Sequence, residues 1–118
     1  MTWFRVDDGF HDHPKTLAVS LAASGLWVRA GSWCGKQLND GLIPTTALRV
    51  ISPDPLSRTR RLAAELVAAG LWDEIPGIGY QFHDWQQSNP TREHVQSERE
   101  RVRAWRERRR AEREQEAL

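Results

Sequence analysis

Three arginines stand close together in a segment whose pattern is typical of a helix: Arg58, Arg60 and Arg61. Guanidinium groups in the first turns of a helix that enters the DNA major groove reach base edges and phosphates. At about 100° per residue, Arg61 shares one stripe with Ser57 and Ala64, and the other two arginines flank it. We expect Arg61 to face bases, beside small neighbours that permit close approach, and Arg58 and Arg60 to face phosphates. The alternative is a solvated arginine face without a ligand.

The helix that carries these arginines is expected to start at Asp54-Pro55 and to end at Gly70. The Asp54 side chain can accept hydrogen bonds from the free amides of a first turn, and Pro55 suits the first helical position. Gly70 supplies the left-handed residue that ends a helix. The opposite side of this helix is predicted to be buried and consists of Leu56, Thr59, Leu62, Ala63, Leu66, Val67 and Ala69.

A shorter helix is predicted immediately upstream, over residues 45–51. Thr45 can cap it, and the hydroxyls and free amides of Thr45 and Thr46 are also suited to contact a backbone phosphate. Ser52-Pro53 prevents the helix from continuing. Two helices joined by a turn of about three residues are the pattern of a helix-turn-helix.

A β-hairpin is predicted downstream, with strands over residues 71–75 and 80–85 and a turn over residues 76–79. Helix followed by hairpin is the order found in a winged helix-turn-helix. Asp73 and Glu74 lie in the first strand, where carboxylates would repel phosphate. The hairpin is therefore expected to close the core more than to bind DNA.

The chain upstream of residue 45 is expected to supply a short strand over residues 3–6 and a helix that Asp12-His13-Pro14 opens and Ser24-Gly25 interrupts. Residues 26–38 form the clearest core helix, and residues 42–44 form a strand fragment. The first helix has the apolar members Leu17, Ala18, Leu21 and Ala22, and the second has Leu26, Ala30, Trp33, Cys34 and Leu38. Trp27, Trp33, Trp72 and Trp85 are expected in the core and in the seam between helices and sheet.

Residues 91–118 are mostly Arg, Glu and Ala without an internal Gly or Pro, which predicts a long helix that Asn89 or Thr91 caps. Three interpretations remain open. Arginines can track phosphates, and the densest run is Arg106, Arg108, Arg109 and Arg110. Ion pairs at i,i+4 can make the helix a self-satisfied solvated one: Arg103–Glu107, Arg108–Glu112 and Arg110–Glu114. Val95, Val102 and Trp105 can form a short coiled-coil seam that supports a weak homodimer.

The composition places limits on the class of protein. The 118 residues carry a net charge of +1 and one cysteine, which excludes an internal disulfide. The N-terminus lacks a signal peptide and no apolar run could span a membrane, so we expect a cytoplasmic protein. Phosphate loops, nucleophile elbows and paired carboxylates are missing, so neither an enzyme nor a cofactor is expected. The spacings of structural zinc sites are also missing among His11, His13, Cys34 and His83.

Five segments carry a resemblance to a known family: WFRVDDGFHDHPK, GLWVRAGSWC, LNDGLIP, LAAELVAAGLW and YQFHDWQQSNPTREHV. Over residues 2–95 the chain resembles small winged-helix proteins of actinobacteria and their phages. These are similar to the N-terminal DNA-binding domain of phage replication initiators of the replisome-organiser, DnaD-like type. The resemblance implies a mainly α (α+β) winged helix-turn-helix fold and binding to double-stranded DNA.

Two functions follow as hypotheses for a domain over residues 2–88 with a charged helical extension over residues 89–118. The first is a double-stranded DNA-binding protein that serves phage or prophage replication initiation or regulation in a bacterial host. The second is a protein-interaction module, in which the winged helix is a scaffold and the C-terminal helix docks on a replisome or host protein. Fold alone does not choose between them.

Overall fold

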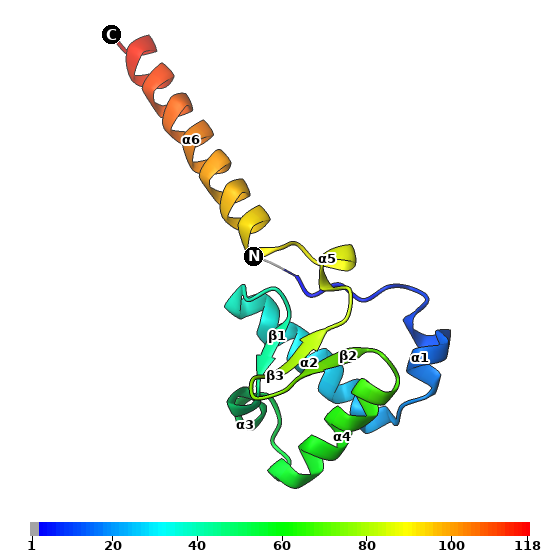
Figure 1. The fold of residues 1–118 in the computed structure, drawn as a ribbon. Coiled ribbons are helices and arrows are strands. Elements are labelled where there is room, and N and C mark those ends of the chain that lie inside the picture. The colour runs from blue at the N-terminus through cyan, green and yellow to red at the C-terminus, as the bar shows by residue number, and fades with distance from the viewer. Residues whose placement is uncertain (1–2) are drawn as a thin grey trace.

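The computed structural model describes residues 3–118, so residue 2, where the predicted domain begins, lies outside the described residues. The fold is mainly helical with one small antiparallel sheet, which confirms the α+β class (Figure 1). Its helices are η1 (Phe10–Asp12), α1 (Pro14–Leu17), α2 (Leu21–Gln37), η2 (Thr45–Ala47), α3 (Leu48–Ile51), α4 (Leu56–Ala68), α5 (Trp85–Ser88) and α6 (Arg92–Glu116), where η marks a 3-10 helix. Its strands are β1 (Leu42–Pro44), β2 (Trp72–Ile75) and β3 (Gly79–Phe82).

Helix α2 is the central helix of the body. Ala23, Leu26, Ala30 and Cys34 follow one another at steps of three or four, which confirms the predicted helical stripe as far as Cys34. The helix starts earlier than expected, because the Ser20 hydroxyl accepts a hydrogen bond from the Ala23 amide and caps it. It ends where Leu38 adopts a left-handed conformation. Its buried residues are Ala23, Leu26, Ala30, Gly31 and Cys34.

The helix predicted from Asp12-His13-Pro14 to Ser24-Gly25 is wrong in two respects. Helix α1 is one turn that ends at Leu17, and Ser24-Gly25 lies inside α2 without interrupting it. The chain changes direction between the two helices, so the predicted apolar face is not continuous. Leu17 and Leu21 are consequently 71% and 90% exposed.

Residues 3–6 form no strand, which corrects the prediction for this segment. The Arg5 amide donates to the side chain of Asn89 at 2.9 Å instead of to a sheet edge. The Phe4 ring packs against Trp27 with a centroid distance of 4.9 Å. It also lies directly over Gly31, where an added Cβ atom would be 2.2 Å from Phe4 Cζ. A glycine in α2 therefore provides the space for the N-terminal segment.

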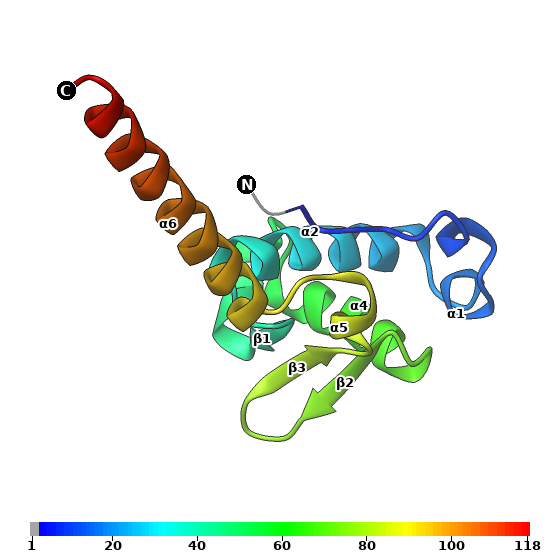
Figure 2. The ribbon, with the colours of Figure 1, turned by 90° about the horizontal axis from the view of Figure 1, so that it is seen from above.

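The sheet has the order β1-β3-β2 with antiparallel pairing throughout. Figure 2 shows α2 and α4 on the same side of this sheet. The predicted strand fragment over residues 42–44 and the predicted hairpin are confirmed, except that the second strand ends at Phe82. Asp84 takes a left-handed conformation and turns the chain into α5, so residues 83–85 are not strand and the predicted connector over residues 86–90 is partly helical.

The core lies between α2, α3, α4 and the sheet. Its largest fully buried side chains are Trp72, Ile43, Leu48, Leu66, Thr59 and Cys34. Trp72 and Trp85 are buried, while Trp27 and Trp33 pack against the core from its edge, as predicted. Trp3 and Trp105 are exposed.

Helix α6 confirms the predicted C-terminal helix and projects from the body, giving a molecule 66 Å long (Figure 1). Its base is fixed at three points. The Thr91 hydroxyl accepts from the His94 amide, Asp40 Oδ1 accepts from the Arg92 amide at 2.6 Å, and Val95 is buried on the body. Because Val95 is used there, the predicted seam of Val95, Val102 and Trp105 loses its first member. No helix within residues 3–118 has the length and hydropathy needed to cross a membrane.

The close approach of Phe4 to Gly31 gives a stability prediction. Gly31→Ala is expected to lower the free energy of unfolding by about 1–3 kcal/mol, because the added methyl group displaces the Phe4 ring. Gly35→Ala on the same helix meets open space. That control is expected to raise the free energy of unfolding by about 0.5–1 kcal/mol, because alanine is the better helix former. Urea unfolding followed by circular dichroism measures both variants. Equal effects of the two substitutions would contradict the placement of Phe4.

Candidate nucleic-acid interface

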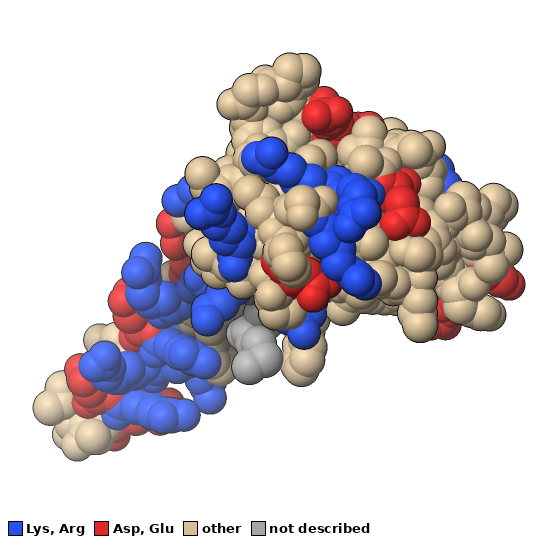
Figure 3. Space-filling view, turned by 90° about the horizontal axis from the view of Figure 1, so that it is seen from below, with Lys and Arg blue, Asp and Glu red and all other residues tan. Residues whose placement is uncertain are grey.

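The exposed side of α4 consists of small residues and arginines. Ser57, Arg60, Arg61 and Ala64 are all exposed, and we call these four residues the α4 face. The other side of the helix is buried at Thr59, Ala63 and Leu66, as the helical periodicity predicts. It packs on α2 and β2, so the α4 face points away from the body. Figure 3 shows that Lys and Arg side chains gather on this side of the body and again along α6.

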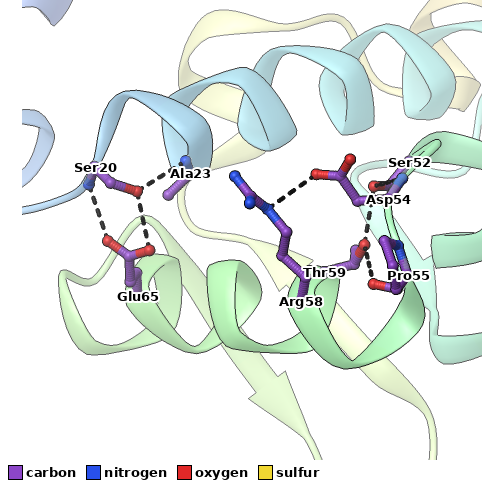
Figure 4. Close-up of polar contacts among 8 residues, drawn as sticks. All are labelled: Ser20, Ala23, Ser52, Asp54, Pro55, Arg58, Thr59 and Glu65. Atoms are coloured by element: carbon purple, nitrogen blue, oxygen red, sulfur yellow. Dashed lines mark hydrogen bonds and ion pairs between the residues drawn. The ribbon is translucent and has the colours of Figure 1, made fainter.

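The start of α4 differs from the prediction. Pro55 occupies the N-cap position and Leu56 is the first helical residue, without a side-chain cap. Asp54 therefore lies one residue too early to bond the free amides. Its carboxylate contacts Arg58 instead, with 3.2 Å between Oδ2 and Nε (Figure 4). Gly70 has a φ of 81° and ends the helix as expected.

The three arginines of this helix therefore differ in whether a carboxylate neutralises their charge. Arg58 is held by Asp54 one turn earlier. Within residues 3–118, Arg60 and Arg61 have no carboxylate within 4.0 Å. Arg60 lies at the edge of the α4 face that is nearest to the sheet: burial and Glu74 raise the pKa of Tyr80, and the Arg60 charge acts against them. The free positive charge is thus centred on Arg60 and Arg61.

Residues 52–55 form the turn between α3 and α4, close to the predicted length. The buried Thr59 hydroxyl donates to Ser52 Oγ at 2.9 Å and lies 3.2 Å from the Pro55 carbonyl oxygen. Ser52 Oγ also accepts from the Asp54 amide (Figure 4). A polar contact inside the turn is strong when its groups are excluded from water. These bonds fix the angle at which α4 leaves α3.

Glu65 is the acidic residue of α4, at the margin of the α4 face. Its carboxylate accepts from the Ser20 amide at 2.9 Å and from the Ser20 hydroxyl at 3.0 Å (Figure 4). Ser20 is the N-cap of α2, where the helix dipole is positive. The negative charge of Glu65 is therefore neutralised at the N-terminus of α2, and the contact joins the two main helices of the body.

The two threonines predicted to contact phosphate have different surroundings. The Thr45 hydroxyl donates to the Ile78 carbonyl oxygen at 3.2 Å, and the Thr45 amide donates to the same oxygen at 3.0 Å. Thr45 thus fastens η2 to the hairpin turn, and it does not cap the helix, because Pro44 takes that position without a side-chain bond. Thr46 is exposed and its hydroxyl is available for a phosphate.

Strand β2 of the hairpin carries two acidic residues. Asp73 and Glu74 are both exposed. Asp73 Oδ2 is 3.1 Å from Nδ1 of His83, whose Nε2 is 3.3 Å from Asp84 Oδ2. His83 follows β3 at the surface, where it forms a hydrogen bond with Asp73 and a close polar contact with Asp84. Nothing in this arrangement makes the hairpin attractive to phosphate.

The four arginines of the run in α6 point to different sides of the helix. Arg106, Arg108, Arg109 and Arg110 are all exposed. At about 100° per residue, Arg106 and Arg110 share one side and Arg108 lies on the opposite side. The Arg109 guanidinium lies over the Trp105 ring, 5.7 Å from its centroid. Figure 1 shows that α6 leaves the body at the end opposite α4. The structure therefore does not bring the two predicted groups of arginines together.

The predicted ion pairs of α6 are also not formed. Across residues 3–118, none of the pairs Arg103–Glu107, Arg108–Glu112 and Arg110–Glu114 lies within 4.0 Å; the pair in this helix is Arg101–Glu98. Long exposed side chains gain little from holding one ion-pair geometry in water. Most arginines of α6 consequently carry free charge.

Other reactive side chains stay apart. In the part of the chain from residue 3 to residue 118, no three His, Cys, Asp or Glu side chains are placed to hold a metal ion. Cys34 lies on the buried side of α2, and burial raises its pKa to about 12. Its thiol is therefore protonated and unreactive at neutral pH.

A scan against protein-family models and searches of curated proteins and of solved structures gave no match for this chain. The geometry of the described residues is therefore the basis of the functional proposal.

Three features of the site were not anticipated from the sequence. The ion pair between Asp54 and Arg58 has i,i+4 spacing and could have been found from that spacing. The contact of Glu65 with Ser20 depends on how α2 packs on α4 and has no local signal. Arg49 is an exposed cation on α3, and its single charge in a short helix gives no pattern.

The contact of Glu65 with Ser20 gives a second stability prediction. Glu65→Gln removes the charge at the N-terminus of α2 and is expected to lower the free energy of unfolding by about 0.5–2 kcal/mol. The matched control is Glu74→Gln, since Glu74 is exposed and its side chain makes no hydrogen bond among residues 3–118. Its effect should stay within about 0.5 kcal/mol. Urea unfolding at pH 7 measures both, and a Glu65 variant as stable as the control would show that this contact does not stabilise the fold.

Proposed function

We propose that this chain is a double-stranded DNA-binding protein of winged helix-turn-helix type. In this proposal α3 and α4 are the helix pair, α4 is the recognition helix, and β2 with β3 is the wing. The chain order α2, β1, α3, α4, β2, β3 and the sheet order β1-β3-β2 support it, because a hairpin directly after the recognition helix is the arrangement of such proteins.

The observation that carries the proposal is the α4 face. Arg60 and Arg61 hold free charge on the side that points away from the body. Ser57 and Ala64 are small, so the helix backbone can approach the floor of a major groove. We assign base contact to Arg61 and phosphate contact to Arg60. Arg58 lies at the edge of this face and can reach a phosphate only by leaving Asp54.

Local electrostatics support the same assignment. Glu65, the acidic residue of α4, has its carboxylate bonded to Ser20. Thr46 lies in η2, directly before α3, and among residues 3–118 its exposed hydroxyl has no hydrogen-bond partner. The first turns of α4 therefore present cations and donors, as a polyanion requires.

The process that DNA binding would serve is proposed from the resemblance of residues 2–95 alone. On that basis we propose a phage or prophage factor for replication initiation or regulation, acting in the cytoplasm of a bacterial host. A protein-interaction module is the second candidate. The specific observation in its favour is Trp105, which is 54% exposed on the projecting helix.

Removal of the two free arginines tests the DNA proposal. Arg60/Arg61→Ala is expected to weaken binding to a fluorescent 25-bp duplex and to flatten the slope of log affinity against log salt by about one to two units. The matched control is Arg29/Lys36→Ala, which removes two exposed charges from α2. Fluorescence anisotropy over a salt series measures both. Equal losses in the two variants, or binding indifferent to salt, would exclude the α4 face.

Asp54→Asn tests the proposed role of Arg58. The substitution releases Arg58 from its ion pair and is expected to strengthen DNA binding and to steepen the salt slope by about one unit. In an Arg58→Ala background the same substitution should change neither quantity. The same anisotropy assay measures this cycle. An Asp54→Asn effect that persists without Arg58 would show that the aspartate acts by general repulsion instead.

A further inference from the structure

Helix α6 carries a continuous row of arginines on one side. Arg99, Arg103, Arg106, Arg110 and Arg113 follow one another at steps of three or four residues, which places them in line on a helix. We call these five residues the arginine row. All five are exposed and, among residues 3–118, none has a carboxylate within 4.0 Å. The row is about 21 Å long at 1.5 Å per residue.

Carboxylates flank the arginine row on both sides. Glu93, Glu100, Glu107 and Glu114 recur every seven residues along one flank, and Glu98, Glu112 and Glu116 lie along the other. Figure 3 shows basic side chains along the near side of α6 and acidic ones at its margin. The positive strip is therefore narrow. A duplex groove would bring phosphates against both flanks, whereas a single row of carboxylates on a partner helix is narrow enough to contact the arginines between the flanks.

Apolar groups accompany the row. Val102 is 41% exposed and lines a shallow hollow together with Glu98, Arg99, Arg103 and Arg106. Trp105 is exposed beside it, with Arg109 over its ring. Exposed tryptophan surrounded by arginine is the composition of protein interfaces, where such side chains contribute most of the binding energy. These apolar groups would make no favourable contact with phosphate.

The base of α6 holds the row in a defined direction. Asp40 and Thr91 bond the first amides of the helix, and Val95 is buried on the body. The row starts one turn beyond Val95 and extends away from α4 (Figure 1). A helix held at its base loses little entropy when it binds, which favours docking.

We propose that the arginine row, with Val102 and Trp105 as apolar anchors, is a docking surface for an acidic amphipathic helix of a partner protein. The guanidinium groups pair with Asp or Glu side chains spaced three and four residues apart on that helix. The apolar residues of the partner helix cover Val102 and Trp105. This surface is separate from the α4 face, so the proposal does not depend on DNA binding.

A designed peptide tests the docking surface on the full chain. The probe is a fluorescent 21-residue peptide with Glu and Leu at helical spacing, and the comparison is a scrambled peptide of the same composition. Arg103/Arg106→Gln is expected to weaken binding of the patterned peptide about tenfold. Arg101/Arg108→Gln removes the same charge from the other side of α6 and should change it less than about twofold. Trp105→Ala should also weaken binding, and helicity by circular dichroism should be equal in all variants.

Three outcomes would overturn the proposal. The two arginine variants could weaken peptide binding equally, or the scrambled peptide could bind as well as the patterned one, and either result would reduce the surface to general charge. Arg103/Arg106→Gln could instead abolish binding to the 25-bp duplex while Arg60/Arg61→Ala preserves it, which would assign the row to nucleic acid. Loss of duplex binding confined to Arg60/Arg61→Ala, with peptide binding intact, supports both proposals at once.

Discussion

The packing of α4 on α2 is the contact on which the rest of the structure depends. It buries Thr59, Ala63 and Leu66 on one helix against the stripe of the other, and the bonds from Ser20 to Glu65 fix their relative position. Because one side of α4 is used in this way, the opposite side must face solvent. The α4 face is thus a consequence of core packing. Its small and basic residues lie on the side that does not contact the core, and the carboxylate of Glu65 is already hydrogen-bonded to Ser20.

Local patterns predicted a large part of this fold. The stripe of α4, the hairpin and α6 were predictable because spacing, turn residues and composition act within a few residues of one another. The first residues of the chain were not. Phe4 is held by the space over Gly31 and by rings from α2, β3 and α5, so its place depends on tertiary contacts. Leu17 and Leu21 show the converse error, because apolar residues at helical spacing are exposed when the chain turns between them.

The candidate site was predicted in part. Arg60 and Arg61 stand where the helical periodicity places them, but Arg58 is paired with Asp54 and Thr45 is bonded to the hairpin turn. Adjacent arginines in α6 are separated by the helix, and the arginines that align are those at steps of three and four. The two groups of arginines predicted from the sequence therefore belong to two separate basic surfaces, at opposite ends of the molecule (Figure 1).

Chemical-shift mapping tests most directly whether the α4 face is the DNA surface. A uniformly ¹⁵N-labelled chain would be titrated with a 25-bp duplex and followed by amide resonances. Binding through the α4 face predicts that the largest shifts occur over Ser57–Ala64 and at Thr46, while the amide resonances of residues 103–113 move little at moderate salt. Shifts confined to α6, with α4 unchanged, would contradict it.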